Sequence, residues 1–278
     1  MNLQSPKKFK MMVDQAHEVA LNVLRPISRK YDKAEHAYPK ELDMLASLID
    51  GMNEGGEGIN AGAAVGKRGE TETGNKNGNN MSTALGIIEM CYGDTGLLLS
   101  MPRQGLGNSA IAAVANDEQL ERFKGTWAAM AITEPGCGSD SAAIRTTATQ
   151  DGDEYILNGE KIFVTSGERA DSVVVWATLD KKLGRAAIKS FVVPKGTAGM
   201  KVERLEHKLG IKASDTAVIS FIDCRVPAAN LLGNPEIDVA KGFAGVMETF
   251  DNTRPLVAAM AIGCAKASLE RIKEIFKD

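Results

Sequence analysis

The chain has 278 residues, 44% of them hydrophobic and 25% charged, and its 33 basic and 36 acidic side chains leave a net charge of −3. This is the composition of a soluble globular protein with a substantial core, and it excludes nucleic acid as the main partner, which would need a strong basic excess. The length indicates two domains or three small ones, and no apolar run approaches the roughly 20 residues of a membrane span. The cysteines form no CxxC pair and the histidines show no metal-ligand spacing, so we expect reduced thiols, a cytoplasmic protein and no metal. These residues are Cys91, Cys137, Cys224 and Cys264, and His17, His36 and His207.

Residues 1–126 are predicted to form an N-terminal all-α domain. Apolar residues from Phe9 to Leu24 recur at three- and four-residue steps, which marks one face of a helix, and Pro26 is expected to end or bend that helix. Pro39 suits the first turn of a second helix, which Gly51 ends.

Residues 52–80 differ in composition, because they are rich in glycine, asparagine and charge and poor in large apolar side chains. Such a stretch cannot bury enough surface to offset its ordering entropy, so we expect a long mobile loop. A phosphate-binding loop is disfavoured, since the stretch contains no GK[ST]. Helical periodicity resumes at Ser82, and Asn116 followed by Gln119 predicts a capping box at the start of a further helix.

Residues 127–236 change to a period of two and are predicted to form a central antiparallel β-barrel domain. The strongest local signal is Tyr155–Thr165, in which Asn158-Gly159 predicts a two-residue hairpin turn. Further strands are expected over 172–178, 190–193 and 217–222. Several strands at near-regular spacing with no helix between them are typical of a barrel or sandwich.

Residues 237–278 return to a helical period and are predicted to be the first helix of an incomplete C-terminal α-helical bundle. Pro255 lies inside the pattern and is expected to kink the helix or to mark its real start. The pattern stops at Asp278 without a cap. Its open apolar face is expected to pack on the N-terminal helices, on another subunit or on residues outside this chain.

The stretch Met130–Asp140 contains a Thr-Glu-Pro turn followed by two glycines and a serine. Pro135 fixes its own φ, and the glycines allow conformations that strain other residues. Such a turn can direct backbone N–H groups and the hydroxyls of Thr133 and Ser139 at one ligand, above all an anion. Taken alone, the spacing is more typical of a plain connection between two strands, because short Gly-Pro turns are common there.

Four motifs in order resemble the acyl-CoA dehydrogenase family. Residues 132–140 match its flavin and substrate signature, and 158–167 match its second flavin segment. Residues 210–216 match the end of its barrel, and 250–255 match the opening of its third domain. The resemblance covers residues 80–278 and implies an α+β multidomain fold: a helical domain, a β-barrel and a four-helix bundle.

The resemblance also implies FAD as cofactor and an acyl-CoA as substrate. The FAD contacts it implies are Met130, Ala131, Ile132, Thr133, Gly138, Ser139, Phe163, Val164 and Thr165. Substrate contacts are implied for Ser139, Asp251 and Arg254. The last two are equally well spaced for a simple i,i+3 ion pair on a helix.

The implied activity is α,β-dehydrogenation of a fatty acyl-CoA to the trans-2-enoyl-CoA in β-oxidation, in a dimer or tetramer of like or unlike subunits, with an electron-transfer flavoprotein as acceptor. A carboxylate near neutral pKa must take the α-proton. The family places its glutamate either directly before the Arg254 position, where this chain has Thr253, or beyond Asp278. No catalytic residue is therefore assigned within the chain. Two alternatives stay open: a non-catalytic subunit of a hetero-oligomer, and an acyl-CoA oxidase or flavin monooxygenase of the same fold.

Overall fold

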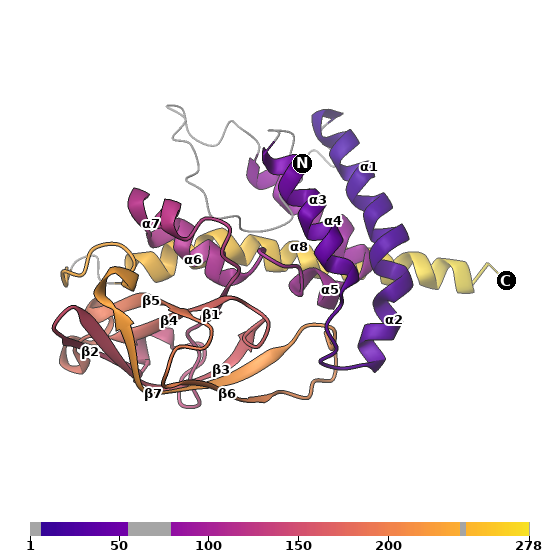
Figure 1. The fold of residues 1–278 in the computed structure, drawn as a ribbon. Helices are drawn as coiled ribbons and strands as arrows, with labels where there is room; N and C mark the ends of the chain where they lie inside the picture. Colours follow the sequence, from indigo (N-terminus) through magenta and orange to yellow (C-terminus); the bar gives the residue numbers. More distant parts are fainter. Residues whose placement is uncertain (1–6, 55–78, 240–242, 278) are drawn as a thin grey trace.

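The computed structural model describes residues 7–54, 79–239 and 243–277, and the loop expected at 52–80 lies almost wholly outside these ranges. Helices come first along the chain and form the upper and right-hand part of Figure 1. Their bounds are η1 Lys7–Phe9, α1 Lys10–Val19, η2 Ala20–Leu24, α2 Arg25–Lys33, α3 Glu41–Glu54, α4 Asn79–Gly93, α5 Thr95–Leu99, α6 Leu106–Val114 and α7 Asp117–Arg122. The prediction of a helical first region is confirmed.

Pro26 neither ends nor sharply divides the first helix. A π-helical turn, η2, precedes α2, and Pro26 lies in the first turn of α2. Proline has no N–H to donate to the preceding turn, so a widened turn is a natural way to absorb the missing bond. The capping box at α7 is confirmed: Gln119 N donates to Asn116 Oδ1 over 2.9 Å, and Asn116 N donates to Gln119 Oε1 over 3.2 Å.

A seven-stranded curled sheet follows, with neighbours in the order β1-β4-β2-β3-β7-β6 and β5 paired to β4. The strands are β1 Ala128–Ala131, β2 Thr147–Asp151, β3 Glu154–Thr165, β4 Ser172–Thr178, β5 Ile188–Pro194, β6 Met200–Leu205 and β7 Thr216–Pro227. The expectation of a purely antiparallel sheet is wrong, because β4 runs parallel to both β1 and β2. A period of two reports which side chains are buried and carries no information on strand direction.

The hairpin predicted at Asn158-Gly159 is also wrong. β3 runs straight through this pair, with an irregularity in its register against β7, and the β2–β3 turn instead lies at Gly152, whose φ is +63°. The Asn158 amide is engaged across the sheet: Asp223 N donates to Asn158 Oδ1 over 2.9 Å. Gly159 is needed for close packing, since a Cβ there would lie 2.4 Å from Thr146 Oγ1.

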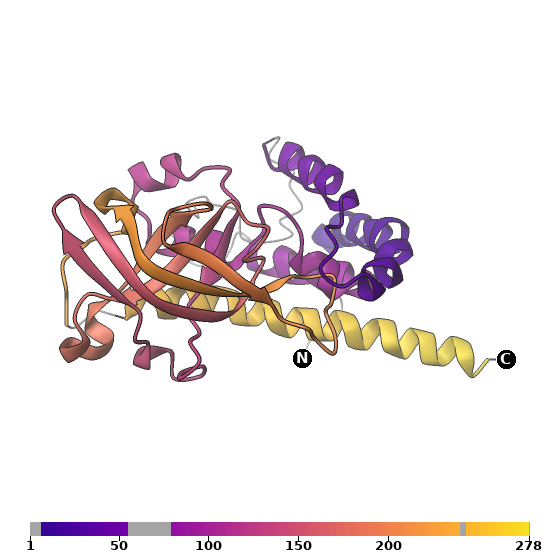
Figure 2. The same cartoon turned by 60° about the horizontal axis from the view of Figure 1, so that its bottom comes forward.

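The long helix α8, Ala244–Ile275, lies along both the helical region and the sheet (Figures 1 and 2). Pro255 lies inside α8 and does not mark its start, so that alternative is wrong. α8 approaches α4 closely at Gly263, where a Cβ would lie 2.4 Å from the Ile88 carbonyl oxygen. Buried Glu89 of α4 accepts from His17 of α1 and from Lys266 of α8, each over 2.7 Å, and thereby joins three helices.

Three groups of buried side chains fill the protein: one inside the curled sheet, one among the N-terminal helices, and one between α6, α8 and the outer face of the sheet. Much of α8 keeps an exposed apolar face. Its exposed members are Met247, Val257, Ile262, Leu269, Ile272 and Ile275. Of the helices in the described ranges, none combines the length and apolarity needed to cross a bilayer.

Candidate functional site

The turn after Ile132 is a tight one at the surface. Glu134 and Cys137 exchange two backbone hydrogen bonds of 3.0 and 3.1 Å, and Pro135 and Gly136 form the exposed tip. Neither Gly136 nor Gly138 adopts a positive φ, so the conformational freedom expected of them is not used. A Cβ at either position would meet nothing within 4 Å, which leaves open space beside the turn.

A buried ion pair supports this turn from below. Lys161 of β3, 0% exposed, donates to Glu134 Oε1 over 2.7 Å and to the Ile132 carbonyl oxygen over 3.0 Å. The Glu134 carboxylate also accepts from Thr146 N and Oγ1 over 2.9 and 2.6 Å, and from Arg145 N over 2.7 Å. Both carboxylate oxygens and the ammonium group therefore have hydrogen-bond partners, as a buried charge requires.

The ionisation of this pair follows from its surroundings. Burial lowers the pKa of Lys161 to about 8, against the opposing attraction of Glu134. Burial alone would raise the pKa of Glu134. The charge and hydrogen bond of Lys161, together with the side-chain and backbone hydrogen bonds from Thr146, instead leave this pKa below its usual value. The sequence analysis missed this pair. Its only signal is a charged residue in the strand-like run 154–165 and a glutamate in the turn.

Two hydrogen bonds join the segments 132–140 and 158–167, which the sequence analysis matched to flavin motifs. Ile162 N donates to the Thr133 carbonyl oxygen over 2.9 Å, next to the Lys161–Ile132 bond. Thr133 and Phe163 thus lie on neighbouring strands of backbone, although 30 positions separate them in the sequence. This adjacency is the geometric requirement for both segments to contact one ligand.

Phe163 has the most unusual conformation in this region. Its φ is +57°, a left-handed value that is strained for a bulky residue, and its side chain is 60% exposed. It sits at an irregularity in the β3–β7 register between Lys161 and Val164. The strained backbone therefore places an aromatic ring at the surface at a cost in stability. Such strain is typical of binding positions.

The remaining candidate residues divide by side-chain direction. Ala131 and Val164 are 0% and 1% exposed in the core of the sheet, so only their backbone can meet a ligand. Met130 and Ile132 pack in the layer between the sheet and α8. Thr133 and Thr165 are half-buried, and Gly138 and Ser139 are exposed. Within the described residues, the hydroxyls of Thr133, Ser139 and Thr165 have no hydrogen-bond partner.

Asp251 and Arg254 lie on the first part of α8. Their closest atoms are 4.0 Å apart, and the side chains are 73% and 62% exposed. The Arg254 guanidinium also lies 5.0 Å from the centroid of the Phe250 ring. The i,i+3 contact expected as an alternative is therefore present in a loose form, and within the described part of the chain neither side chain hydrogen-bonds to the turn.

A buried threonine occupies the position at which the resemblance would place a glutamate base. Thr253 is 6% exposed, and its hydroxyl donates to the Phe250 carbonyl oxygen over 3.4 Å. Glu248, a nearby carboxylate of α8, is exposed. The described residues offer no buried carboxylate on this turn of α8.

Comparison with known proteins agrees with this geometry. Residues 129–224 match the family model of the acyl-CoA dehydrogenase middle domain. The short-chain specific acyl-CoA dehydrogenase of Clostridium acetobutylicum is 30% identical over 286 residues, which cover 100% of this chain and 70% of that protein. The solved structure of butyryl-CoA dehydrogenase from Megasphaera elsdenii superposes with a TM-score of 0.78 at 30% identity, covering 99% of this chain and 70% of that one.

A further similar chain comes from a structure described as the electron transferring flavoprotein of Acidaminococcus fermentans. Its TM-score is 0.74 at 33% identity, and the match covers 97% of this chain and 68% of that chain. The chain spans 63–70% of the length of the first curated relatives it matches. Since one relative is 30% identical along 70% of its own length, and the two flavin-segment motifs lie side by side in the fold, the chain belongs to the acyl-CoA dehydrogenase family.

Proposed function

We propose that this chain is the flavin-binding part of an FAD-dependent acyl-CoA dehydrogenase, which converts an acyl-CoA to its trans-2-enoyl thioester. The observation that carries the proposal is the pair of bonds that joins Ile132–Thr133 to Lys161–Ile162, of 3.0 and 2.9 Å. These bonds hold the Thr133 hydroxyl and the exposed Phe163 ring on adjacent segments.

The residues around these bonds fit a flat aromatic cofactor with a polar edge. Phe163 offers an outward aromatic face, and Thr133 and Thr165 offer half-buried hydroxyls without partners in the described chain. The open space beside Gly136 and Gly138 admits a ligand close to the backbone. Bound FAD would supply the two-electron acceptor that no side chain can provide.

The protein's own contribution is position and electrostatics. The Thr133 hydroxyl would donate to the polar edge of the cofactor and so favour its electron-rich reduced form. Lys161 and Glu134 would act behind the turn, where they fix the position of Thr133 and do not reach the ligand. Backbone atoms of Met130, Ala131, Ile132 and Val164 would complete the wall.

The substrate would enter from the side of Gly138 and Ser139. We assign Ser139, Asp251 and Arg254 to the coenzyme A thioester, and we propose a short acyl chain because the similar proteins named above act on short-chain and butyryl substrates. The base is proposed to lie outside these 278 residues, since Thr253 has no carboxylate. We also propose three domains, a helical one at 1–126, a β-barrel at 127–236 and the start of a helical bundle at 237–278. The protein is proposed to be a cytoplasmic dimer or tetramer that acts in fatty acid β-oxidation, with an electron-transfer flavoprotein as its electron acceptor.

The test is a flavin titration followed by anaerobic reduction. We expect the purified protein to bind FAD, and the intact gene product to be bleached by butyryl-CoA under nitrogen. Thr133→Val should weaken FAD binding or lower the flavin potential, while Thr149→Val, at a β2 position outside the site, should leave both unchanged. An unchanged redox titration for Thr133→Val would remove that residue from the site.

Thr253 supports a second candidate, a non-catalytic subunit that binds flavin beside an active partner. Such a subunit would bind FAD without reduction by any acyl-CoA of any chain length. An oxidase of the same fold would instead show rapid reoxidation of its reduced flavin in air. Anaerobic and aerobic spectra of one sample therefore separate the three.

A further inference from the structure

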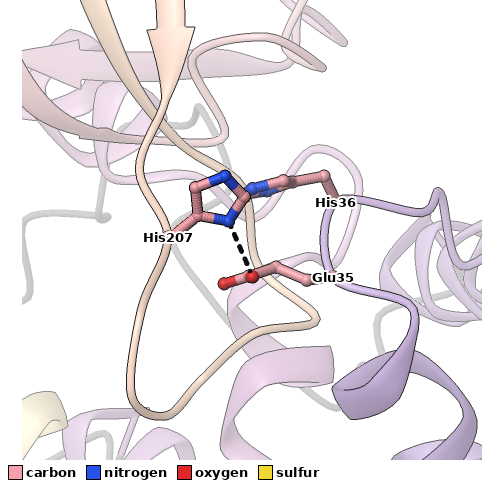
Figure 3. Close-up of side chains that lie close together, drawn as sticks. All are labelled: Glu35, His36 and His207. Carbon is pink, nitrogen blue, oxygen red and sulfur yellow. Dashed lines mark hydrogen bonds and ion pairs between the residues drawn. The ribbon is translucent and has the colours of Figure 1, made fainter.

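Three potential metal ligands meet on the surface, far from the flavin segments in sequence. Glu35 and His36 lie in the connection between α2 and α3, and His207 lies in the connection between β6 and β7 (Figure 3). One donor atom from each residue lies within 4.8 Å of the donor atoms of the other two. The sequence analysis expected no metal because the histidines are widely spaced, but the fold brings two of the three together.

We propose that Glu35, His36 and His207 form a binding site for a divalent transition metal of the zinc type. Two imidazoles and one carboxylate are ordinary ligands of Zn²⁺, and a water completes the tetrahedron when the protein supplies three. Nitrogen donors disfavour Mg²⁺ and Ca²⁺, which prefer oxygen ligands throughout.

His36 is the residue whose state most calls for a ligand. Both its ring nitrogens are buried, and neither has a hydrogen-bond partner within the described chain. Its backbone also adopts a left-handed φ of +69°. An unpaired buried imidazole is unfavourable, and a bound cation would satisfy one of its nitrogens.

Glu35 is already prepared as a ligand. Its carboxylate accepts from Lys208 N over 2.8 Å and contacts His207 Nδ1 at 3.0 Å. Lys212 is a nearby positive charge that a metal would have to tolerate.

The three donors need only a modest rearrangement to hold one ion. Tetrahedral zinc with bonds of about 2.1 Å requires donors about 3.4 Å apart. The rings of His36 and His207 have centroids 5.2 Å apart and are inclined by 56°. The His207 side chain is 84% exposed, so its ring has room to turn away from Glu35 and admit the ion.

A metal here would fasten the helical region to the sheet. The same seam contains Arg169, which donates to the Ala37 carbonyl oxygen over 2.9 Å and pairs with buried Asp215 at 3.3 Å. Asp215 also accepts from Glu168 N over 2.9 Å, close to the end of β3. The ion would therefore reinforce a connection between regions already joined by a buried charge.

The test uses protein without a histidine tag, freed of metal by a chelator and titrated with Zn²⁺ by calorimetry and with Co²⁺ by absorption spectroscopy. We expect one ion per chain and a rise in melting temperature with Zn²⁺. His207→Ala, at an exposed ring, and His36→Asn, which tolerates left-handed backbone, should each weaken binding at least about tenfold and remove the thermal shift.

His17→Gln is the matched control, since His17 is the remaining one of the three histidines and lies outside the cluster. This variant should bind Zn²⁺ and Co²⁺ like the parent protein. The proposal is overturned if the parent binds neither ion, if the His36 and His207 variants bind as tightly as the parent, or if Mg²⁺ competes equally with Zn²⁺.

Discussion

Two pairs of opposite charges are included in the proposed site, and they are built in opposite ways. Lys161 and Glu134 are 2.7 Å apart with 0% and 7% of their side chains exposed, whereas Arg254 and Asp251 are 4.0 Å apart with 62% and 73% exposed. The buried pair has one geometry, which several backbone and hydroxyl donors enforce. The exposed pair is free to exchange its partner for a ligand. The turn that we propose to face the flavin is thus preorganised, while the residues proposed to contact coenzyme A remain available.

Breaking the buried pair should produce the largest effect. Lys161→Met leaves the Glu134 carboxylate buried without its cation, and we expect a loss of about 3–5 kcal/mol in the free energy of unfolding. Urea denaturation measures this loss. The double variant Lys161→Met/Glu134→Gln removes the uncompensated charge and should recover part of it. A loss below about 1 kcal/mol in the single variant would contradict a structural role for the pair.

Variants of Phe163, in β3 beside the turn, should separate an effect on stability from an effect on FAD binding. Phe163→Gly removes the left-handed strain, and after the entropic cost of glycine we expect a gain of about 0.5–1 kcal/mol in unfolding free energy, with weaker FAD binding. Phe163→Tyr keeps an aromatic ring and should retain FAD. Denaturation and flavin titration of both variants give the answer, and tight FAD binding by the glycine variant would remove Phe163 from the site.

A third pair, Lys30 and Glu41, lies between the two extremes and sharpens the comparison. The atoms are 2.7 Å apart, and Glu41 is 37% exposed. Hydrogen bonds from Lys30 and then Tyr31 lower the pKa of Glu41 to about 2. A carboxyl whose pKa is lowered by folding stabilises the folded state at any pH above its pKa in the unfolded chain. This contribution disappears as the pH falls from about 4.5 towards 2.

Because water screens a partly exposed pair, we expect Glu41 to contribute no more than about 1 kcal/mol at neutral pH. Glu41→Gln should therefore be slightly less stable at pH 7 and should lose less stability on acidification. Melting temperatures measured across pH 2–7 test both parts. Parallel acid curves for the parent and the variant would refute the assignment.

The exposed pair should have the smallest effect on stability. Arg254→Gln is expected to change the free energy of unfolding by less than about 0.5 kcal/mol, since an i,i+3 surface pair contributes only tenths. The same variant should weaken binding of an acyl-CoA to the FAD-loaded protein. Arg271→Gln, at another i,i+3 pair of α8, serves as control. Equal acyl-CoA affinity in the two variants would show that Arg254 only forms a surface ion pair with Asp251 and does not bind the substrate.

Sequence reasoning predicted the fold where local signals and burial agree. The order of helices, strands and helix follows from the periodicity, and the capping box at Asn116 depends only on residues three apart. It failed at Asn158-Gly159 because a distant residue, Asp223, engages the asparagine and because Gly159 is required by the close approach of Thr146. The prediction of strand direction failed for a similar reason, since β1 pairs with β4, and the strands β2 and β3 lie between the two in the chain.

The candidate site was predictable only in part. The adjacency of Thr133 and Phe163 was implied by family resemblance. Lys161 was not foreseen as a buried charge, because a lysine in a strand normally reads as solvent-exposed. The cluster of Glu35 with His207 escaped notice because its members come from connections 172 positions apart. Contacts of that kind depend on how elements dock, which no local pattern encodes.

Pro255 has one more consequence for α8. A proline inside a helix donates nothing to the carbonyl four residues earlier, and in this chain that carbonyl belongs to Asp251. The same helical turn that presents the loose charged pair therefore also carries a backbone oxygen without its usual amide. This part of α8 therefore has one backbone hydrogen bond fewer than an uninterrupted helix, and the Asp251 carbonyl oxygen lacks the amide donor that a helix normally supplies.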